Sequence, residues 1–442
     1  GWFDCTDFGS LRGSMMFERY DAYKDSGVEW LRDVPKHWEI VRIKSLSLVR
    51  RGASPRPIDA PKYFSENGEY AWVRIADVTA SNHYLTETKE KLSKLGSSYS
   101  VKILPGQLFL SIAGSVGKPI ISRIKCCIHD GFVYFPFLKI DNEFLYRVFE
   151  CGTPFIGLGK HGTQLNLNTE TVGNIKIALP PQNEQLAIVN FLDRKTLEID
   201  QLIEIKEQQI ALLNERKQIV IQKAVTQGLD QNVPMKDSGV EWIGQIPEHW
   251  EVIRSKFLFT QRKENSKKDD VQLSATQAYG VIPQEEYEKR TGKSVVKISL
   301  HLDKRKRVYL NDFVISMRSF QGGLERAWAE GCIRSSYVVL KPLKPIDPDY
   351  YGHLFKTPMY IKALQNTSNF IRDGQDLNFG NFSQVDLFIV PLSEQKQIVE
   401  YIKSQLGDFE KHLELLNQQI EKLKEYKTTL INDAVTGKIK VA

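Results

Sequence analysis

One short stretch of the sequence resembles a phosphate-binding loop but lacks two of its essential residues. Such a loop needs the pattern GxxxxGK[ST], in which glycines cradle the phosphates and the last hydroxyl binds Mg²⁺. Residues 113–119 read AGSVGKP and end in Gly117, Lys118 and Pro119. The proline replaces the hydroxyl residue, and Ile112 stands where the first glycine belongs. Nucleotide hydrolysis by this chain is therefore not expected.

Two further stretches imitate parts of an adenine methyltransferase. Residues 155–159, FIGLG, resemble a glycine turn that binds a cofactor, and residues 347–350 read DPDY. The catalytic loop of such enzymes needs Asn/Asp-Pro-Pro-aromatic, whereas Asp349 occupies the place of the second proline. A carboxylate beside the extruded base would change the shape and charge of the pocket. We therefore interpret residues 347–350 as a turn.

A third set of residues matches the loosest pattern of a metal-dependent nuclease. Asp77 is followed by Glu87-Thr88-Lys89, one acid and then an E-x-K triplet, which a chain rich in Lys and Glu also produces by accident. The chain contains no HExxH and no GxSxG motif, and its eight histidines are scattered. A self-contained metal-dependent nuclease or methyltransferase is therefore kept as an alternative to a chain without catalytic activity.

Basic and amide side chains gather in loops that are rich in Gly and Asn. Asn and Gln suit the edge of adenine and Arg suits guanine, so these loops could read bases. Asn and Gly are equally common in ordinary turns, and for any single residue both interpretations stay open. The candidates for DNA binding are Lys118, Lys160, His161, Gln164, Asn166 and Asn168 in the first half, and Arg305, Arg307, Arg318, Arg372, Gln375, Asn378 and Asn381 in the second.

Composition restricts the class of protein. The chain has 442 residues, 41% of them hydrophobic and 26% charged, which is typical of globular domains and permits two to four of them. It has no apolar run long enough to span a membrane and no secretory signal pattern. The five cysteines contain no CxxC pair, so a reducing cytoplasm is expected. Residues 1–14 are unlike the rest and are interpreted as an expression remnant.

The chain is an internal tandem repeat. Residues 24–39 read KDSGVEWLRDVPKHWE and residues 236–251 read KDSGVEWIGQIPEHWE, with eleven of sixteen positions identical. A second pair of blocks is offset by 210 residues, and it matches PPQNEQLAIVNFL with VPLSEQKQIVEYI and QQIALLNERKQIVIQKAVT with QQIEKLKEYKTTLINDAVT. Between the blocks lie about 140 unlike residues in each half, which suggests two versions of one task.

The second pair of blocks predicts two long helices. Apolar residues recur at alternating steps of three and four over four heptads, which indicates a coiled-coil seam. The seam consists of Ile199, Ile203, Ile210, Leu213 and Val220 in the first helix, and of Phe409, Leu413, Leu416, Ile420, Leu423 and Leu430 in the second. Asn183 and Ser393 are the expected N-caps, and Gly228 and Gly437 the expected stops. An antiparallel pair is favoured because the chain must return.

Charge and strand pattern describe the regions between the blocks. Residues 183–227 carry six Lys/Arg against seven Asp/Glu, and residues 393–436 carry six against eight, so the remaining residues hold a net charge of +9. Basic regions on nearly neutral helices suit a polyanion held at two points. These regions contain short β-type runs separated by turn residues. We predict an α+β chain with a probable remnant at 1–14, lobes at 15–180 and 229–390, and helical segments at 181–228 and 391–442.

These motifs together resemble the specificity subunit of bacterial type I restriction–modification systems. The resemblance rests on GVEW…P.HW at the start of each half and on the EQ..IV and QQI…AVT blocks at its end, and it covers the chain from Lys24 onward. It implies two mixed, β-rich target recognition domains, each reading half of a split site on double-stranded DNA. A long antiparallel two-helix coiled coil would separate them in a pseudo-twofold repeat and set the gap between the half-sites.

The resemblance also implies how the chemistry is divided among partners. The chain would be non-catalytic and bind no cofactor itself. Two modification subunits would hold S-adenosylmethionine, and restriction subunits would use ATP and Mg. It further implies DNA-facing turns at residues 111–118 and 161–168 in the first domain, and at 317–323 and 373–381 in the second. A coiled-coil scaffold without affinity for nucleic acid is a further alternative.

Overall fold

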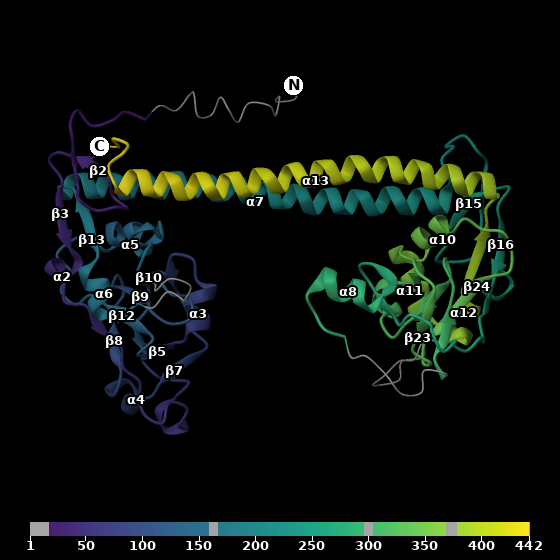
Figure 1. The fold of residues 1–442 in the computed structure, drawn as a ribbon, viewed down its shortest axis with the longest axis horizontal. Helices are drawn as coiled ribbons and strands as arrows, with labels where there is room; N and C mark the ends of the chain where they lie inside the picture. The colour runs from purple at the N-terminus through teal and green to yellow at the C-terminus, as the bar shows by residue number, and fades with distance from the viewer. Residues whose placement is uncertain (1–16, 159–166, 296–303, 368–377, 442) are drawn as a thin grey trace. The chain divides into compact units, whose positions relative to one another are not determined.

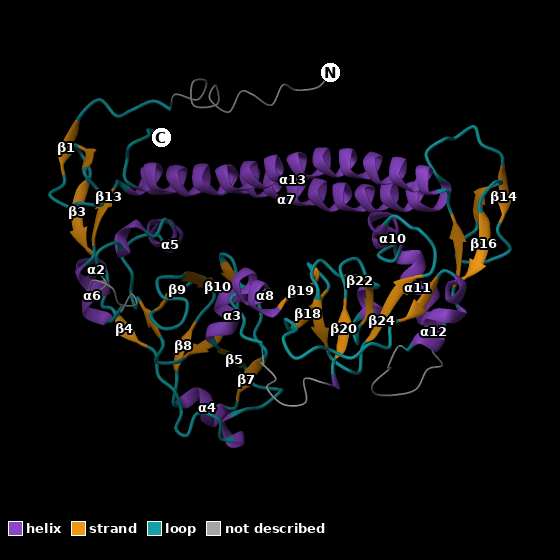
Figure 2. Cartoon of the chain, turned by 45° about the vertical axis from the view of Figure 1, so that its right-hand side comes forward, coloured by secondary structure: helices purple, strands orange, loops and turns teal. Residues whose placement is uncertain are grey.

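The structure is a computed structural model that describes residues 17–158, 167–295, 304–367 and 378–441. The chain divides into two compact units. The first unit comprises residues 1–206 and 418–442, and the second comprises residues 207–417. Each unit combines helices and sheets, as expected for an α+β chain. Figures 1 and 2 show the elements that are named below.

Two long helices contribute to both units. Helix α7 spans Gln182–Gln227 and helix α13 spans Leu392–Val435. In the first unit the early part of α7 packs on the late part of α13 in one hydrophobic core, and Lys427 Nζ lies 2.7 Å from Asp200 Oδ1. In the second unit the late part of α7 packs on the early part of α13. The predicted pairing of the helices is therefore confirmed, and the two helices run in opposite directions (Figure 1).

The predicted seam lies between the paired helices. Every seam position is buried or half-buried, and Ile199, Phe409, Ile420, Leu423 and Leu430 are each less than 9% exposed. Exposed apolar residues on the same helices lie outside the seam. Each helix therefore buries its seam residues against its partner and leaves other apolar residues exposed on its remaining surface.

The ends of the helices differ in part from the expectation. Both helices begin at the residue after a proline, Pro181 and Pro391, so Asn183 and Ser393 lie inside the first turn and are not N-caps. Proline suits this place because its fixed backbone angle leads into a helix and it has no N–H to leave unpaired. The predicted stops are correct: Gly228 and Gly437 adopt φ values of +74° and +71°.

The first lobe, residues 43–175, is built on two sheets. The five-stranded sheet has the order β4-β12-β9-β10-β6 and the four-stranded sheet has the order β7-β5-β11-β8. Apolar residues on strands of both sheets form one compact core that includes Phe109, Ile120 and Phe132. The strands are β4 (Arg50–Arg51), β5 (Tyr70–Val73), β6 (Tyr84–Leu85), β7 (Glu90–Leu92), β8 (Val101–Ile103), β9 (Leu108–Ser111), β10 (Pro119–Ser122), β11 (Cys126–Ile128) and β12 (Phe132–Tyr134). The helices are α2 (Ile43–Leu46), α3 (Ile75–Ala80), α4 (Lys94–Ser98), α5 (Asn142–Glu150) and α6 (Thr169–Asn174), with 3₁₀ turns η1 (Pro61–Tyr63) and η2 (Thr153–Phe155).

The second lobe, residues 255–385, contains a four-stranded sheet of order β17-β24-β21-β22 and the pairs β18-β19 and β20-β23. The strands are β17 (Phe259–Gln261), β18 (Leu273–Thr276), β19 (Gly280–Pro283), β20 (Lys306–Val308), β21 (Phe313–Ile315), β22 (Glu325–Arg326), β23 (Gly331–Ile333) and β24 (Val338–Pro342). The helices are α8 (Gln284–Thr291), α9 (Ser319–Gly322), α10 (Pro348–Leu354), α11 (Pro358–Asn366) and α12 (Phe379–Gln384), with the 3₁₀ turn η3 (Ser255–Phe257). Residues 347–350 were interpreted as a turn, and this was wrong, because Asp347 caps α10 through the backbone N–H groups of Asp349 and Tyr350.

The two lobes share a strand order despite their unlike sequences. Strands β4-β12-β9-β10 of the first lobe and β17-β24-β21-β22 of the second are both antiparallel throughout and are connected in the same chain order. Each lobe is followed by an equivalent strand, β13 (Lys176–Leu179) or β25 (Asp386–Ile389). That strand pairs with β3 (Glu39–Arg42) in the first unit and with β16 (Glu251–Arg254) in the second.

The repeated opening blocks fold alike and hold the start of a long helix. Each forms a strand pair: β1 (Tyr23–Asp25) with β2 (Asp33–Pro35), and β14 (Met235–Asp237) with β15 (Gln245–Pro247). In the first unit Glu184 accepts hydrogen bonds from Trp38 Nε1 at 3.0 Å and from Tyr20 Oη at 3.0 Å, and its Oε1 lies 2.7 Å from His37 Nε2. We call this cluster the carboxylate node. His37 and Trp38 thus connect the opening block to the first turn of α7.

The second unit contains a second carboxylate node. Glu394 Oε2 accepts a hydrogen bond from Trp250 Nε1 at 3.1 Å and lies 2.9 Å from His249 Nε2. The two tryptophans Trp38 and Trp250 have no exposed surface. The cysteines of the described residues are free and buried, and no helix among those residues is long and apolar enough to cross a membrane.

Candidate nucleic-acid interface

The turn between β9 and β10 carries the first predicted basic residue. Gly114 and Gly117 have positive φ values of +66° and +84°, which glycine adopts without steric cost. Lys118 is half-buried and its Nζ donates to the carbonyl oxygen of Thr79 at 3.0 Å. Burial lowers the pKa of Lys118. The residues that imitate a phosphate-binding loop thus form a tight hairpin turn that directs a cation towards helix α3.

The equivalent turn of the second lobe lies between β21 and β22 and includes the short helix α9. Met317 and Arg318 are exposed on it. The backbone carbonyl of Arg318 accepts a hydrogen bond from Gln277 Nε2 at 3.0 Å, which fixes the turn. Among the described residues, no hydrogen bond or ion pair is formed by the guanidinium of Arg318. This cation is therefore available to a polyanion.

Two of the predicted asparagines, Asn168 and Asn378, are helix N-caps, and a third, Asn381, completes a capping box. The Oδ1 atom of Asn168 accepts from the N–H groups of Glu170 and Thr171 at the start of α6. Asn378 and Asn381 form the equivalent capping box at the start of α12, and Asn381 Nδ2 also donates to the carbonyl oxygen of Thr367. Helix capping thus accounts for the side-chain oxygens of these asparagines, and their role in DNA binding stays a prediction.

The basic cluster at residues 304–307 is divided between the interior and the surface. Arg305 is only 5% exposed, and Arg307 pairs with Asp270 and with Glu330, whose Oε2 lies 3.4 Å from Arg307 Nη2. Lys306 Nζ donates to the carbonyl oxygen of Tyr337 at 2.5 Å. The structure therefore places most of this cluster in contacts within the lobe and not on a free basic surface.

The remaining candidates lie outside the described residues. They are Lys160, His161, Gln164 and Asn166 in residues 159–166, and Arg372 and Gln375 in residues 368–377. Each of these segments ends next to a capping asparagine, Asn168 or Asn378, at the start of α6 or α12. Their role in DNA binding stays a prediction.

A concave site in the second lobe was not predicted from the sequence. A pocket of about 430 Å³ is lined by Glu325, Arg326 and Trp328, among others. The Arg326 guanidinium lies 4.1 Å from the ring centre of Trp328, which is 53% exposed. Burial raises the pKa of Glu325 to about 7 although Lys356 Nζ lies 2.8 Å away. Residues 324–328 read LERAW, which matches no motif, so the sequence carries no signal for this site.

Asp77 of the nuclease-like pattern has a local role. Asp77 Oδ2 accepts a hydrogen bond from the backbone N–H of Arg74 at 2.8 Å, which closes the first turn of α3. In the described ranges no group of three or more His, Cys, Asp or Glu side chains is arranged to hold a metal ion. The geometry instead supports one candidate site in each lobe. It is the turn after β9 in the first lobe and the turn after the equivalent strand β21 in the second, and the polar side chains differ between the two turns.

Comparisons with known proteins show what the whole chain is similar to. Residues 35–215 match the family described as the type I restriction modification DNA specificity domain. The chain is 25% identical over 462 aligned positions to the type I restriction enzyme MjaVIII specificity subunit of Methanocaldococcus jannaschii, and the match covers 97% of this chain and 98% of that protein.

Solved structures were compared as well. One chain from a structure described as "Structural basis underlying complex assembly and conformational transition of the type I R-M system" aligns with a TM-score of 0.63 and 15% identity, covering 91% of this chain and 98% of that one. The HsdS subunit from Thermoanaerobacter tengcongensis aligns over 92% of this chain and 98% of its own length with a TM-score of 0.48 and 15% identity. The first of these shows a shared fold. Together with the matched domain and the full-length relative, it leads to one conclusion: over nearly its whole length the chain is similar to the specificity subunits of type I restriction–modification systems.

Proposed function

We propose that each lobe is a target recognition domain that reads one half of a bipartite site on double-stranded DNA. The observation that supports this best is the shared strand order of two lobes whose sequences differ. One framework that carries two different turns suits one task performed on two targets. The turn after β9 offers Lys118 and glycines, whereas the turn after β21 offers Met317 and Arg318. Because side chains on such turns reach base edges and phosphates, we propose that they set the two half-sites.

The helix pair is proposed to act as the spacer between the half-sites in a pseudo-twofold repeat. Helix α7 has 46 residues, which correspond to about 69 Å at about 1.5 Å per residue. At about 3.4 Å per base pair, such a length compares with roughly twenty base pairs of duplex. A buried seam along the helices favours a stiff spacer, since bending would expose Ile199 or Leu430 and their neighbours to water.

Two modification subunits are proposed to dock on surfaces that the two halves share. Glu29 and Glu241 are equivalent and exposed, and neither has a hydrogen bond or ion pair among the described residues. Exposed neighbours in the same blocks have changed between the halves, for example Lys36 to Glu248, so an exposed position there is free to drift. A residue kept at two equivalent exposed positions suits one kind of partner that binds twice. The exposed Leu212 and Ile219 on α7 add apolar surface for docking.

The chemistry is proposed to belong to the partners. Modification subunits would hold S-adenosylmethionine and methylate adenine, and restriction subunits would use ATP and Mg to move and cut DNA. This chain would bind no cofactor of its own and would act in the cytoplasm, where the DNA lies. Its contribution would be the choice of sequence and of spacing.

Sequencing that detects adenine methylation tests this proposal. The chain is expressed with its modification partner in cells that lack other adenine methyltransferases, and genomic DNA is sequenced. We expect methylated adenines in two short sequences separated by a gap of fixed length. A second strain carries the variant Arg318→Ala, which should weaken methylation without changing the stability of the chain.

The outcomes divide clearly. A bipartite motif with a fixed gap supports the proposal, and loss of methylation with Arg318→Ala assigns part of the contact to the second lobe. A continuous motif, or none with an active partner present, overturns it. Methylation by the isolated chain with S-adenosylmethionine would instead favour the self-contained enzyme.

A further inference from the structure

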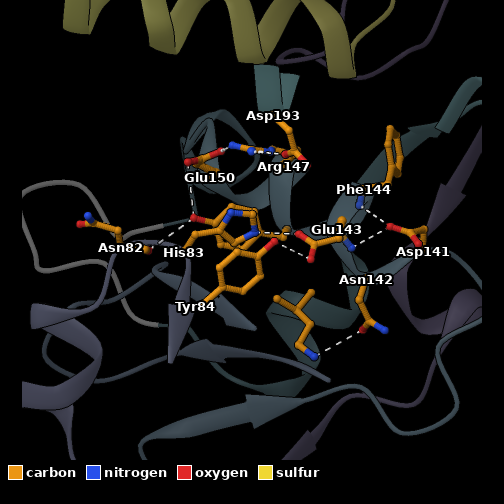
Figure 3. Close-up of polar contacts among 12 residues, drawn as sticks. Asn82, His83, Tyr84, Asp141, Asn142, Glu143, Phe144, Arg147, Glu150 and Asp193 are labelled. Atoms are coloured by element: carbon orange, nitrogen blue, oxygen red, sulfur yellow. Dashed lines mark hydrogen bonds and ion pairs between the residues drawn. The ribbon is translucent and has the colours of Figure 1, made fainter. Parts of the chain in front are cut away.

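An ion pair connects the first lobe to helix α7. Arg147 on α5 is buried, with 4% of its side chain exposed, and its Nη2 donates to Asp193 Oδ1 on α7 at 2.5 Å (Figure 3). Its Nη1 donates to Glu150 Oε2 at 2.6 Å. Figure 3 shows the guanidinium between these two carboxylates. The lobe therefore presents a positive charge to a negative charge on the helix.

The second lobe has the opposite arrangement. Asp349 on α10 accepts from Lys403 Nζ on α13 at 3.0 Å, and it also pairs with Arg326 of its own lobe. Burial tends to raise the pKa of Asp349, but Lys403 and Arg326 outweigh this effect and lower it, so the group is a carboxylate near neutral pH. Here the lobe presents a negative charge and the helix a positive one.

The two helix positions are equivalent in the repeat. Gln185 and Gln395 each donate from Nε2 to a backbone carbonyl five residues earlier, at 2.9 and 2.8 Å. Asp193 and Lys403 both lie eight residues after these glutamines. Helices α5 and α10 are equivalent as well. Each is capped by an aspartate that accepts hydrogen bonds from the backbone N–H groups two and three residues after it.

The residues equivalent to Asp349 and Arg147 in the opposite lobe do not reverse these charges. Glu143, which corresponds to Asp349, lies 2.7 Å from His83 Nε2 and accepts from Tyr84 Oη at 2.9 Å. Figure 3 shows it directed to this pair and away from Asp193. In the second lobe, His353 corresponds to Arg147, and burial lowers its pKa, which removes a positive charge near neutral pH.

We propose that these reversed ion pairs match each lobe to its own half of the chain. The residue at position 193 or 403 selects a lobe of opposite charge, so Asp193 and Lys403 are positioning residues for the recognition domains. A lobe moved to the other half would bring Arg147 against Lys403, or Asp349 against Asp193. Like charges at a partly buried contact are unfavourable, even though Arg147 would keep Glu150 and Asp349 would keep Arg326 as a partner within its own lobe. Exchange of lobes then requires exchange of these two helix residues as well.

Charge reversal and neutralisation at position 193 distinguish this proposal from a simple hydrogen bond. We compare Asp193→Lys, Asp193→Asn and the conservative Asp193→Glu by thermal unfolding of the full chain at low and high salt. Asp193→Lys should lower the melting temperature by about 4–8 °C and Asp193→Asn by about half as much. Asp193→Glu should stay within about 2 °C of the wild type. High salt should reduce the difference in melting temperature between Asp193→Lys and Asp193→Asn, because it screens the repulsion between like charges.

The pair in the second half provides an independent arm. Lys403 is 61% exposed, so Lys403→Asp should lower the melting temperature by only about 2 °C, and Lys403→Gln by less. The proposal is supported if reversal exceeds neutralisation in both halves and salt narrows the difference. It is overturned if reversal and neutralisation are equal at position 193, or if salt leaves their difference unchanged.

The assignment of the lobes as recognition domains rests on the proposed function, but this measurement does not. Melting of the chain requires neither DNA nor a modification subunit. A failure here would leave a bipartite methylation pattern intact. A continuous methylation motif would leave the charge match intact and would change only what the lobes are for.

Discussion

Removing the carboxylate of Glu184 should destabilise the first unit more than almost any other single change at its surface. Glu184→Ala leaves Trp38 Nε1, which is fully buried, without its acceptor, and also deprives Tyr20 and His37 of theirs. An unsatisfied buried donor costs about 1–3 kcal/mol, and the two more exposed contacts add about 0.5 kcal/mol each. We therefore expect a loss of about 2–4 kcal/mol, or roughly 4–16 °C in melting temperature for a unit of this size.

The pH dependence gives a second test of the same node. Burial acts to raise the pKa of Glu184, but hydrogen bonds from Trp38, His37 and Tyr20 outweigh it and lower the pKa. Because the folded pKa lies below the unfolded value of about 4.3, the charged carboxylate stabilises the fold fully above that pH. The stabilisation is lost as the pH falls from about 4.3 through the folded pKa. The difference in stability between wild type and Glu184→Gln should shrink over that range.

Thermal unfolding followed by calorimetry from pH 3 to 8 measures both effects. Glu394→Ala is the matched variant in the second unit and should cost less, since Glu394 has two polar partners and not three. Glu29→Ala is the control, because Glu29 is exposed without a hydrogen bond or ion pair among the described residues. A Glu184→Ala chain within 0.5 kcal/mol of wild type would refute the assignment of the node as a structural anchor.

Four further predictions follow from other parts of the molecule. Insertion of four residues next to Gln208 adds about 6 Å to the helix, and the preferred gap should lengthen by one or two base pairs with both half-sites unchanged, as read by methylation sequencing. Leu430→Ala should cost about 2–4 kcal/mol in denaturant unfolding, since this seam residue is 3% exposed. Arg318→Ala should lower affinity for duplex DNA and reduce the salt slope by about one, whereas Arg307→Ala should lower stability because its guanidinium pairs within the lobe. Glu325→Gln should abolish the loss of stability between about pH 4.3 and 7, because the raised pKa makes the unfolded state release its proton first as pH rises.

Each of these predictions has an outcome that contradicts it. Altered half-sites after the insertion would mean that the helices do not set the spacing. Exposed Leu415 serves as the control for Leu430, and equal costs at both positions would refute the seam. An unchanged salt slope with Arg318→Ala would remove this residue from the DNA contact. A pH slope that survives Glu325→Gln would assign it to another group.

The sequence predicted the long helices and their seam because a heptad repeat is a local signal. The regular spacing of apolar residues is visible in the sequence itself. Seam residues such as Phe409 and Ile420 could therefore be identified without knowing the fold of the lobes. The starts of the helices were misplaced because Asn183 and Ser393 were predicted as N-caps, whereas each helix begins directly after a proline. Local propensity favoured the asparagine and the serine, and the fixed backbone angle of proline decided the boundary.

The lobes were much less accessible from the sequence. Their shared strand order depends on pairings between strands far apart in the chain, such as β9 with β12, and unlike residues satisfy the same pairing. Arg305 and Arg307 were predicted to contact DNA, but Arg305 precedes strand β20 and is buried, and Arg307 pairs with acidic residues of its own lobe, which residue type alone does not reveal. The caps at Asn168 and Asn378 could be found only by weighing the start of a short helix against base reading.

The repeat also has a consequence for where the chain could begin. Gly228, at the end of α7, lies beside Pro247 and Trp250, and the chain continues from it directly into the second opening block. Gly437, at the end of α13, lies in the same way beside Pro35 and Trp38, and Tyr23 Oη donates to its carbonyl oxygen at 3.0 Å. The two long helices thus end against equivalent opening blocks, and a circular order of the elements would keep the hydrogen bonds that each junction makes within its own unit.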